Sequence, residues 1–433
     1  MHNYALTTDG RPVTEVEETI KAHLPGLDVD LIQFSPRQAV LRGHAVRALD
    51  IEYAPNGAAS LLRDWGVERI QSLSDEETVT LLRTRDLADL EPRRVAAAPP
   101  GTRFDWHLEA CSVPAAWALL GGPEAIAWGD VRIGHIDTGY TEHPALGFPS
   151  PWVLTRLART FVIPPRVGEG SPDTVELGDG RDNLAGFSGG HGTRMAGTMC
   201  GFAPSENYYG VAPKVPLIPV RITDSVWINH VQAEFAQAVH YLTQTERVSV
   251  INVSLGVFPG TGMSRFREAV ARAYEAGVIV ACAAGNYVNS VVSPACLSRT
   301  VAVAGVTDTD APWSGSSYGL EVDISAPAGE VRRASTSRTG KFRYEGGGDG
   351  TSYASAMTSG AAALWLAYHG PAIDAAYPEP WQRVEAFAQL LRATARKPTN
   401  WNPGAFGNGV LNVANLLGND LPSPSILTKA LST

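Results

Sequence analysis

The sequence predicts an α/β protein: a doubly wound, mostly parallel sheet with helices on both faces, preceded by a small α+β N-terminal domain. Short, nearly continuous apolar runs rich in valine and isoleucine have the character of buried strands; they cover residues 131–136, 215–222, 248–253, 278–283 and 300–306. Helical patterns lie between them, as in the spacing of Val231, Phe235, Val239 and Leu242. Strands and helices that alternate in this way build a parallel sheet covered on both faces.

The composition divides the chain into four parts. Residues 1–91 are rich in charges and poor in the glycine and alanine of later segments, and their patterns predict helices over 13–24 and 58–65 and strands near 29–34 and 48–53. Prolines and a glycine make 92–104 a linker. The main domain is expected over 105–420 and a loose C-terminal tail over 421–433.

The bulk composition excludes some classes of function. The chain has 433 residues, 44% hydrophobic and 18% charged, which suits a large folded core. Its formal charge of -9 argues against binding to nucleic acid or an anionic membrane, because both require clustered positive charge. The sequence shows neither a secretory signal nor a membrane-spanning apolar run. We therefore expect a cytoplasmic protein, or a secreted one if a signal peptide has been trimmed.

The four cysteines are few and widely spread, so a disulfide framework is not expected. Free, mostly buried thiols are the favoured interpretation. Cys282 and Cys296 are the pair that could join in an oxidising compartment, and their spacing leaves this open.

Polar residues that could take part in catalysis or ligand binding follow the predicted strands. Asp137, Ser254 and Asn286 each come at or just after a strand end. Ligands of parallel sheets bind beyond the carboxyl ends of the strands, so this is where a site should lie.

The sequence also supplies the groups that amide hydrolysis requires: a nucleophile, a base, a group that orients the base, and oxyanion donors. A carboxylate stands in Asp137-Thr138-Gly139, an imidazole in His191-Gly192-Thr193, and a hydroxyl in Gly350-Thr351-Ser352. Taken singly these segments are a common turn, a common dipeptide and a common helix cap. Their joint presence carries the prediction.

These segments, with their flanks, resemble the three signatures of the subtilisin-like serine proteases. The flanks are His143-Pro144, Ala196-Gly197-Thr198 and Ala354-Ser355, and further matches lie in Asn252-Val253-Ser254-Leu255-Gly256 and Ala283-Ala284-Gly285-Asn286. The resemblance extends over about residues 105–417. The order Asp, His, Ser is that of this family and differs from the orders of chymotrypsin-like enzymes and α/β-hydrolases.

The resemblance implies a serine endopeptidase that acts on a protein or peptide through an acyl-enzyme. Ser352 would be the nucleophile, His191 the general base and Asp137 its orienting partner. Asn286 and the backbone N–H of Ser352 would form the oxyanion hole.

Two backbone stretches would flank the specificity pocket, and each allows close approach of an extended substrate: Ser254, Leu255 and Gly256, and Ala283, Ala284 and Gly285. The plain alternative is that they are tight strand ends. Because no charged residue directly follows Asn286, we expect a neutral or apolar substrate preference.

Three positions depart from the family pattern. Ala356 replaces a usual proline, Arg194 a common second histidine, and Ala145 an aspartate that often binds structural calcium. No cofactor is required, no metal ligand is assigned, and calcium is doubtful. One loop is acidic and contains Asp173, Glu176, Asp179 and Asp182. It could hold calcium, but a solvated acidic surface is the favoured interpretation. His135 shares a strand face with Asp137 and is expected to be a packed histidine.

The resemblance leaves the N-terminal domain open between two roles. It would be either a propeptide that inhibits the catalytic domain in cis, processed near Arg93-Arg94, or a permanent domain that binds a regulatory partner. The competing function is a catalytically silent subtilisin-like binding or regulatory protein. The presence of all three triad residues and of Asn286 argues against it.

Overall fold

The computed structural model describes residues 2–8, 13–23, 29–35, 38–43, 67–73, 105–162, 179–184, 188–226, 228, 231–258, 263–337 and 339–432. The chain forms two compact units, Met1–Ala96 and Ala97–Thr433.

The N-terminal unit contains a four-stranded sheet in the order β2-β3-β1-β4 with one described helix. Its elements are β1 (His2–Thr8), α1 (Val13–His23), β2 (Val29–Ser35), β3 (Gln38–Gly43) and β4 (Val67–Leu73). The strand pairs β1–β3, β1–β4 and β2–β3 are antiparallel. α1 and β2 occupy the predicted helix and first strand. The strand expected near 48–53 and the helix expected near 58–65 lie outside the described residues.

The second unit is built on a seven-stranded sheet in the order β13-β12-β11-β10-β5-β9-β6. Each pair of neighbours is parallel. The strands are β5 (Ile133–Asp137), β6 (Arg159–Thr160), β9 (Leu217–Arg221), β10 (Val250–Val253), β11 (Ile279–Ala283), β12 (Val301–Val306) and β13 (Ile324–Pro327). The parallel α/β class predicted from the alternating pattern is confirmed.

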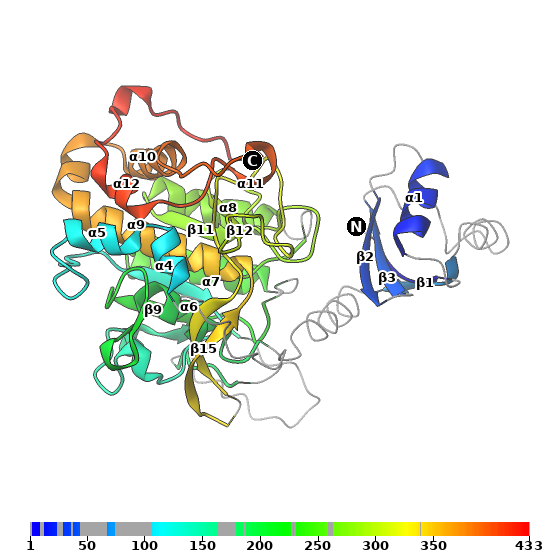
Figure 1. Cartoon of the computed structure of the whole chain (residues 1–433), viewed down its shortest axis with the longest axis horizontal. Helices are drawn as coiled ribbons and strands as arrows, with labels where there is room; N and C mark the ends of the chain where they lie inside the picture. The colour runs from blue at the N-terminus through cyan, green and yellow to red at the C-terminus, as the bar shows by residue number, and fades with distance from the viewer. Residues whose placement is uncertain are drawn as a thin grey trace. The chain divides into compact units, whose positions relative to one another are not determined.

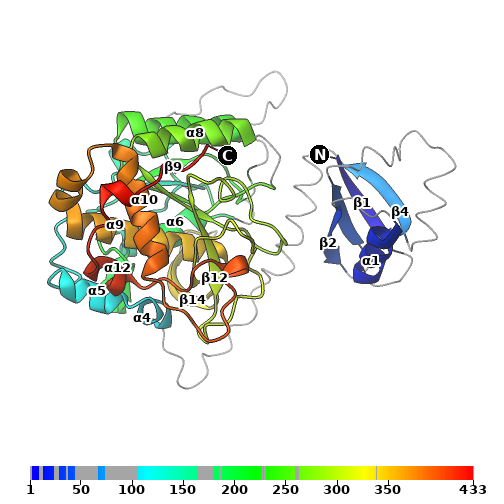
Figure 2. The same ribbon diagram turned by 90° about the horizontal axis from the view of Figure 1, so that it is seen from above.

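Helices cover both faces of this sheet (Figure 1). α6 (His191–Cys200) and α9 (Thr351–Ala376) share one apolar core with strand residues such as Ile133, whereas α7 (Gln232–His240) and α8 (Met263–Glu275) share the other with Ile136. Figure 2 shows α8 and α9 on opposite sides of the strands. Alternate strand side chains point to opposite faces, so β5, β9, β10, β11 and β12 each contribute to both cores.

Further helices and strands complete the unit. They are α4 (Trp106–Ala110), α5 (Val113–Leu119), α10 (Pro380–Ala393), α11 (Pro403–Phe406), α12 (Val413–Gly418), the small pair β7 (Phe202–Ala203) and β8 (Tyr208–Tyr209), and the hairpin β14 (Val331–Thr336) and β15 (Phe342–Gly348). No helix among the described residues is long and apolar enough to cross a membrane.

The expectation of a loose tail after residue 420 is wrong. The Tyr377 hydroxyl donates to the Pro422 carbonyl at 2.8 Å, and Lys429 forms an ion pair with Glu275 at 2.6 Å. The Arg299 guanidinium donates twice to the Ala430 carbonyl, at 3.0 and 3.1 Å. The tail is held largely through its backbone carbonyls, which a reading of side-chain types does not detect.

Candidate active site

Asp137 and His191 form a directly bonded pair at the carboxyl end of β5. Asp137 is fully buried, and its Oδ1 lies 2.8 Å from Nδ1 of His191 and accepts the Thr138 backbone N–H at 2.7 Å. An ionised carboxylate can only accept hydrogen bonds, so Nδ1 of His191 carries the proton. Nε2 of the neutral ring is then the basic nitrogen.

The surroundings of Asp137 favour its charged form. Burial by itself raises the pKa of a carboxyl group, but the nearby His191 and the hydrogen bonds to Oδ1 outweigh it and hold the pKa of Asp137 below its ordinary value of 3.8. Asp137 is therefore an anion at neutral pH.

Glycines allow the segment that carries His191 to pack on the turn that carries Asp137. A Cβ on Gly192 would lie 2.0 Å from the Gly139 carbonyl oxygen, a distance that backbone atoms cannot accommodate. The Gly192 N–H also donates to the Thr138 hydroxyl at 3.0 Å. Gly190, the N-cap residue of α6, has φ of +76°, in the left-handed region that favours glycine.

Ser352 lies in the first turn of α9, where the helix dipole provides a modest positive field. Its hydroxyl donates to the Ser254 carbonyl at 3.2 Å, and the Ser254 hydroxyl donates to the Ser352 carbonyl at 3.1 Å. This reciprocal pair fixes the serine against the end of β10.

Asn286 lies beside the same helix start. Its Oδ1 accepts both the backbone N–H and the hydroxyl of Thr351, at 2.9 and 2.8 Å. These bonds use the carbonyl side of the amide and leave Nδ2 as a donor. Gly350, with φ of +135°, passes so close that an added Cβ would lie 3.2 Å from Nδ2.

The two predicted substrate-binding stretches meet across Val292. A Cβ on Gly256 or Gly285 would lie 2.4 or 2.7 Å from the methyl groups of this valine. The Gly256 N–H donates to the Val226 carbonyl and its carbonyl accepts the Ile228 N–H, both at 3.1 Å. An extended substrate that pairs with Gly256 would have to replace these two bonds.

The Ser254-Leu255-Gly256 stretch directly follows β10. In the other stretch, Ala283 ends β11, Ala284 is bonded to Val303 and Val292 through its backbone, and Gly285 contacts Thr351. The structure thus brings both stretches to the carboxyl ends of neighbouring strands, next to Ser352 and Asn286.

The sequence places Asp182 in an acidic loop that could bind calcium, but in the structure its carboxylate forms hydrogen bonds beside the active site. Its Oδ2 accepts the Thr138 hydroxyl at 2.6 Å and the Gly190 N–H at 2.8 Å, and its Oδ1 accepts the Leu184 N–H at 2.7 Å. Asp182 therefore joins the turn after Asp137 to the start of α6. Asp173 and Glu176 lie outside the described residues, and Asp179 pairs with Arg181 at 3.3 Å.

The departures from the family pattern are accommodated without a break in the elements around them. Ala356 is buried inside the continuous helix α9, and Arg194 donates from Nη1 to the Gly189 carbonyl at 3.1 Å. Ala145 is buried and donates its N–H to Nδ1 of His143 at 3.0 Å. All four cysteines are free thiols.

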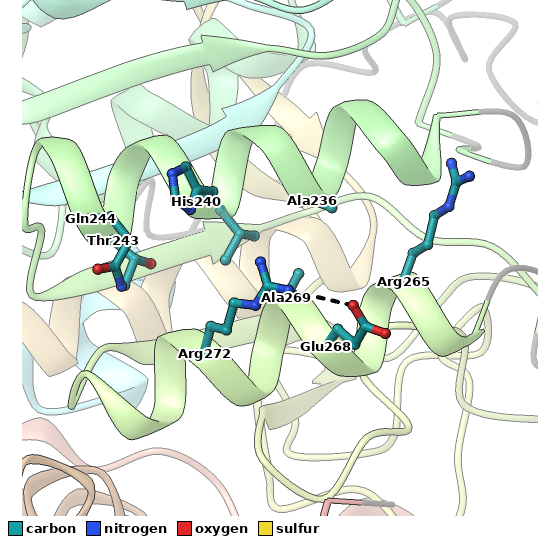
Figure 3. A pocket seen from close by; sticks show the side chains of 9 residues that line it. Ala236, His240, Thr243, Gln244, Arg265, Glu268, Ala269 and Arg272 are labelled. Carbon is teal, nitrogen blue, oxygen red and sulfur yellow. Dashed lines mark ion pairs between the residues drawn. The ribbon is translucent and has the colours of Figure 1, made fainter.

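A hollow lies between α7 and α8, and no triad residue lines it (Figure 3). Glu268 and Arg272 form an ion pair at 3.5 Å on its α8 side. These helices cover the sheet face opposite to α6 and α9, so the hollow is separate from the candidate active site.

The chain belongs to the subtilase family, whose family model matches residues 130–409. Among relatives, Subtilisin NAT of Bacillus subtilis subsp. natto is 32% identical over 230 residues, 52% of this chain and 54% of that protein. A thermostable alkaline protease of Halalkalibacterium halodurans is 30% identical over 287 residues, 65% of this chain and 66% of that protein. The chain thus spans about half the length of the first curated relatives it matches.

A solved structure gives the same fold. The crystal structure of MycP1 with the N-terminal propeptide removed matches with a TM-score of 0.54 and 21% identity, covering 73% of this chain and 98% of that one. The subtilisin-like α/β architecture expected from the motifs is confirmed.

Proposed function

We propose that the protein is a serine endopeptidase that hydrolyses peptide bonds through an acyl-enzyme. The observation that supports this most directly is the 2.8 Å bond from His191 to Asp137, which directs the basic Nε2 away from the carboxylate. The family membership and the names of the relatives, which include subtilisins and an alkaline protease, support the same activity.

The residues divide the reaction into roles. Nε2 of His191 takes the proton of the Ser352 hydroxyl as Ser352 attacks the substrate carbonyl, and then passes that proton to the leaving amine. Asp137 keeps the imidazole in the required tautomer and stabilises the imidazolium. Nucleophile and base are often not yet aligned in a free enzyme, so the Ser352–Ser254 bond is consistent with this step.

Asn286 and the Ser352 backbone N–H supply the donors for the developing oxyanion. Since Thr351 holds the carbonyl side of the Asn286 amide, Nδ2 is orientated before substrate arrives, which is the condition for strong electrostatic stabilisation. The two substrate-binding stretches, residues 254–256 and 283–285, carry no charge, so a protein or peptide with neutral or apolar side chains at the cleavage site fits them.

Hydrolysis of labelled casein tests the proposal. Wild type should release fluorescent peptides, Ser352→Ala should lose this activity to the background level, and Ser425→Ala, in the exposed tail, should keep it. Equal activity in wild type and Ser352→Ala would show that Ser352 is not the nucleophile. An inactive, folded wild type would favour the alternative of a catalytically silent binding protein.

For the N-terminal unit we propose that it inhibits the catalytic domain in cis or binds a regulatory partner. If it is a propeptide, intact mass after incubation should show loss of residues up to a cleavage between about Leu90 and Trp106 in wild type, and a full-length chain in Ser352→Ala. A wild type that stays whole while active would speak for the permanent domain instead.

A further inference from the structure

His135 lies inside β5, two residues before Asp137, and its side chain is fully buried. Its Nε2 is 3.0 Å from the Gly192 carbonyl oxygen and its Nδ1 is 3.2 Å from Nδ2 of Asn252. A carbonyl oxygen only accepts and an amide nitrogen only donates. Nε2 of His135 therefore carries the proton and Nδ1 accepts, so the ring is neutral.

The direction of these bonds is fixed by the rest of the network. The Ser254 hydroxyl donates its one proton to the Ser352 carbonyl, so it can only accept a hydrogen bond from Asn252. Nδ2 of Asn252 must therefore be the donor at 3.0 Å, and the same NH₂ group faces His135. Oδ1 of Asn252 is left to accept the hydroxyls of Ser355 and Ser359, at 3.2 and 2.9 Å.

This network connects the elements that carry the catalytic residues. His135 lies on the strand that ends in Asp137, Gly192 follows His191 in α6, and Asn252 and Ser254 lie on or just after β10. Ser352, Ser355 and Ser359 lie in the first turns of α9. Every side chain of the network is at least nine-tenths buried, where an unpaired polar group would be costly.

The charged neighbours of His135 are members of the catalytic pair. Asp137 faces it from β5, with Oδ2 at 3.9 Å from Nε2, and His191 faces it from α6. Among the described residues Oδ2 of Asp137 accepts no hydrogen bond. Burial lowers the pKa of His135, although Asp137 opposes this. Protonation would also turn Nδ1 into a donor facing the donor of Asn252.

We propose that neutral His135 is a positioning residue, which holds the backbone beside His191 through Gly192 and couples it through Asn252 to the elements that carry Ser352. The inference rests on the proposed protease function. The observation behind it is that both ring nitrogens of His135 are engaged by segments of the active site, Gly192 beside His191 and Asn252 on β10.

Kinetics of three variants test the proposal with a peptide p-nitroanilide of apolar side chain. His135→Val keeps a strand-forming residue but removes both bonds, so kcat should fall about 10- to 100-fold with KM nearly unchanged, because small displacements of catalytic groups cost rates of this order. His135→Gln can still donate to the Gly192 carbonyl and should recover most of the loss. His107→Leu, which removes a buried histidine outside the network, should retain the wild-type kcat.

The proposal is overturned if His135→Val, shown to be folded by its thermal unfolding, keeps the wild-type kcat, or if His135→Gln and His135→Val lose kcat equally. An active wild type with either result would leave the protease function standing. Long-range ¹H–¹⁵N spectra of the imidazoles in Ser352→Ala do not depend on activity. They should show His135 as the neutral Nε2–H tautomer at pH 7, and an Nδ1–H or charged ring would contradict the proposed network.

Discussion

At the residue scale, motifs predict those functional residues that lie within short, recognisable segments of the sequence. Asp137, His191, Ser352 and Asn286 each stand in such a segment, and the structure brings them to one end of the sheet. Asp182 and His135 act through hydrogen bonds to residues far away in the chain: Asp182 bonds to Thr138, 44 positions away, and His135 to Gly192, 57 positions away. No local pattern encodes such contacts. A buried histidine in a strand was the available signal, and packing alone was a sufficient explanation for it.

Asn286 makes a prediction at this scale. Asn286→Ala removes the Nδ2 donor, so kcat should fall about 10²- to 10³-fold while KM changes little, which is the loss known for the oxyanion-hole asparagine of subtilisin, a member of the same family. Steady-state kinetics with the same p-nitroanilide measure it. Asn289→Ala, an exposed neighbour, is the matched control. Equal losses in the two variants would mean that Asn286 acts only through packing.

At the element scale, hydrophobic patterning located β5, β9, β10, β11 and β12, because strands buried on both faces read as continuous apolar runs. It missed β6, which has only two residues, and β13, whose sequence Ile-Ser-Ala-Pro is not a continuous apolar run. The hairpin of β14 and β15 was missed for another reason. Its strands include charged residues that are partly buried, such as Arg333 and Glu345, paired at 3.4 Å.

The tail was misjudged at the same scale. Prolines and serines after Leu421 suggested a loose end, but a segment with a single short 3-10 turn, Pro424–Ile426, can still be held by side chains from the rest of the unit. The Tyr274 hydroxyl oxygen accepts the Ala430 N–H at 2.9 Å, and the Arg299 guanidinium donates to the Ala430 carbonyl at 3.0 and 3.1 Å.

At the scale of the whole molecule, two apolar cores on opposite faces of one parallel sheet fix the strand ends, and the candidate site is assembled at those ends. The parallel class could be predicted because it depends only on the order of strands and helices. The reciprocal contact between Ser254 and Ser352 could not, because it depends on how α9 packs against β10.

Stability against acid is a prediction for the molecule as a whole. Burial, assisted by nearby Arg332, lowers the pKa of His107 to about 3, and burial lowers that of His143 to about 4. Each unfolded histidine binds a proton near its ordinary pKa of 6.5 while the folded one does not. The contribution of each to stability is thus complete above pH 6.5 and is lost as the pH falls from 6.5 toward the folded value.

Urea unfolding at pH 7 and pH 5 measures this effect. For His107→Leu, the decrease in the free energy of unfolding between these two pH values should be smaller than in wild type by about 2 kcal/mol. If the variant loses as much stability as wild type on acidification, His107 is not a buried neutral base.

The central claim is that Ser352 is a nucleophile activated by His191 and Asp137. The native protein, treated with a fluorophosphonate and digested, should carry one covalent adduct, and mass spectrometry should place it on Ser352. The same treatment of Ser352→Ala should yield no adduct, and Asp137→Asn should react much more slowly than wild type. An adduct on another residue, or equal labelling of wild type and Ser352→Ala, would contradict the account.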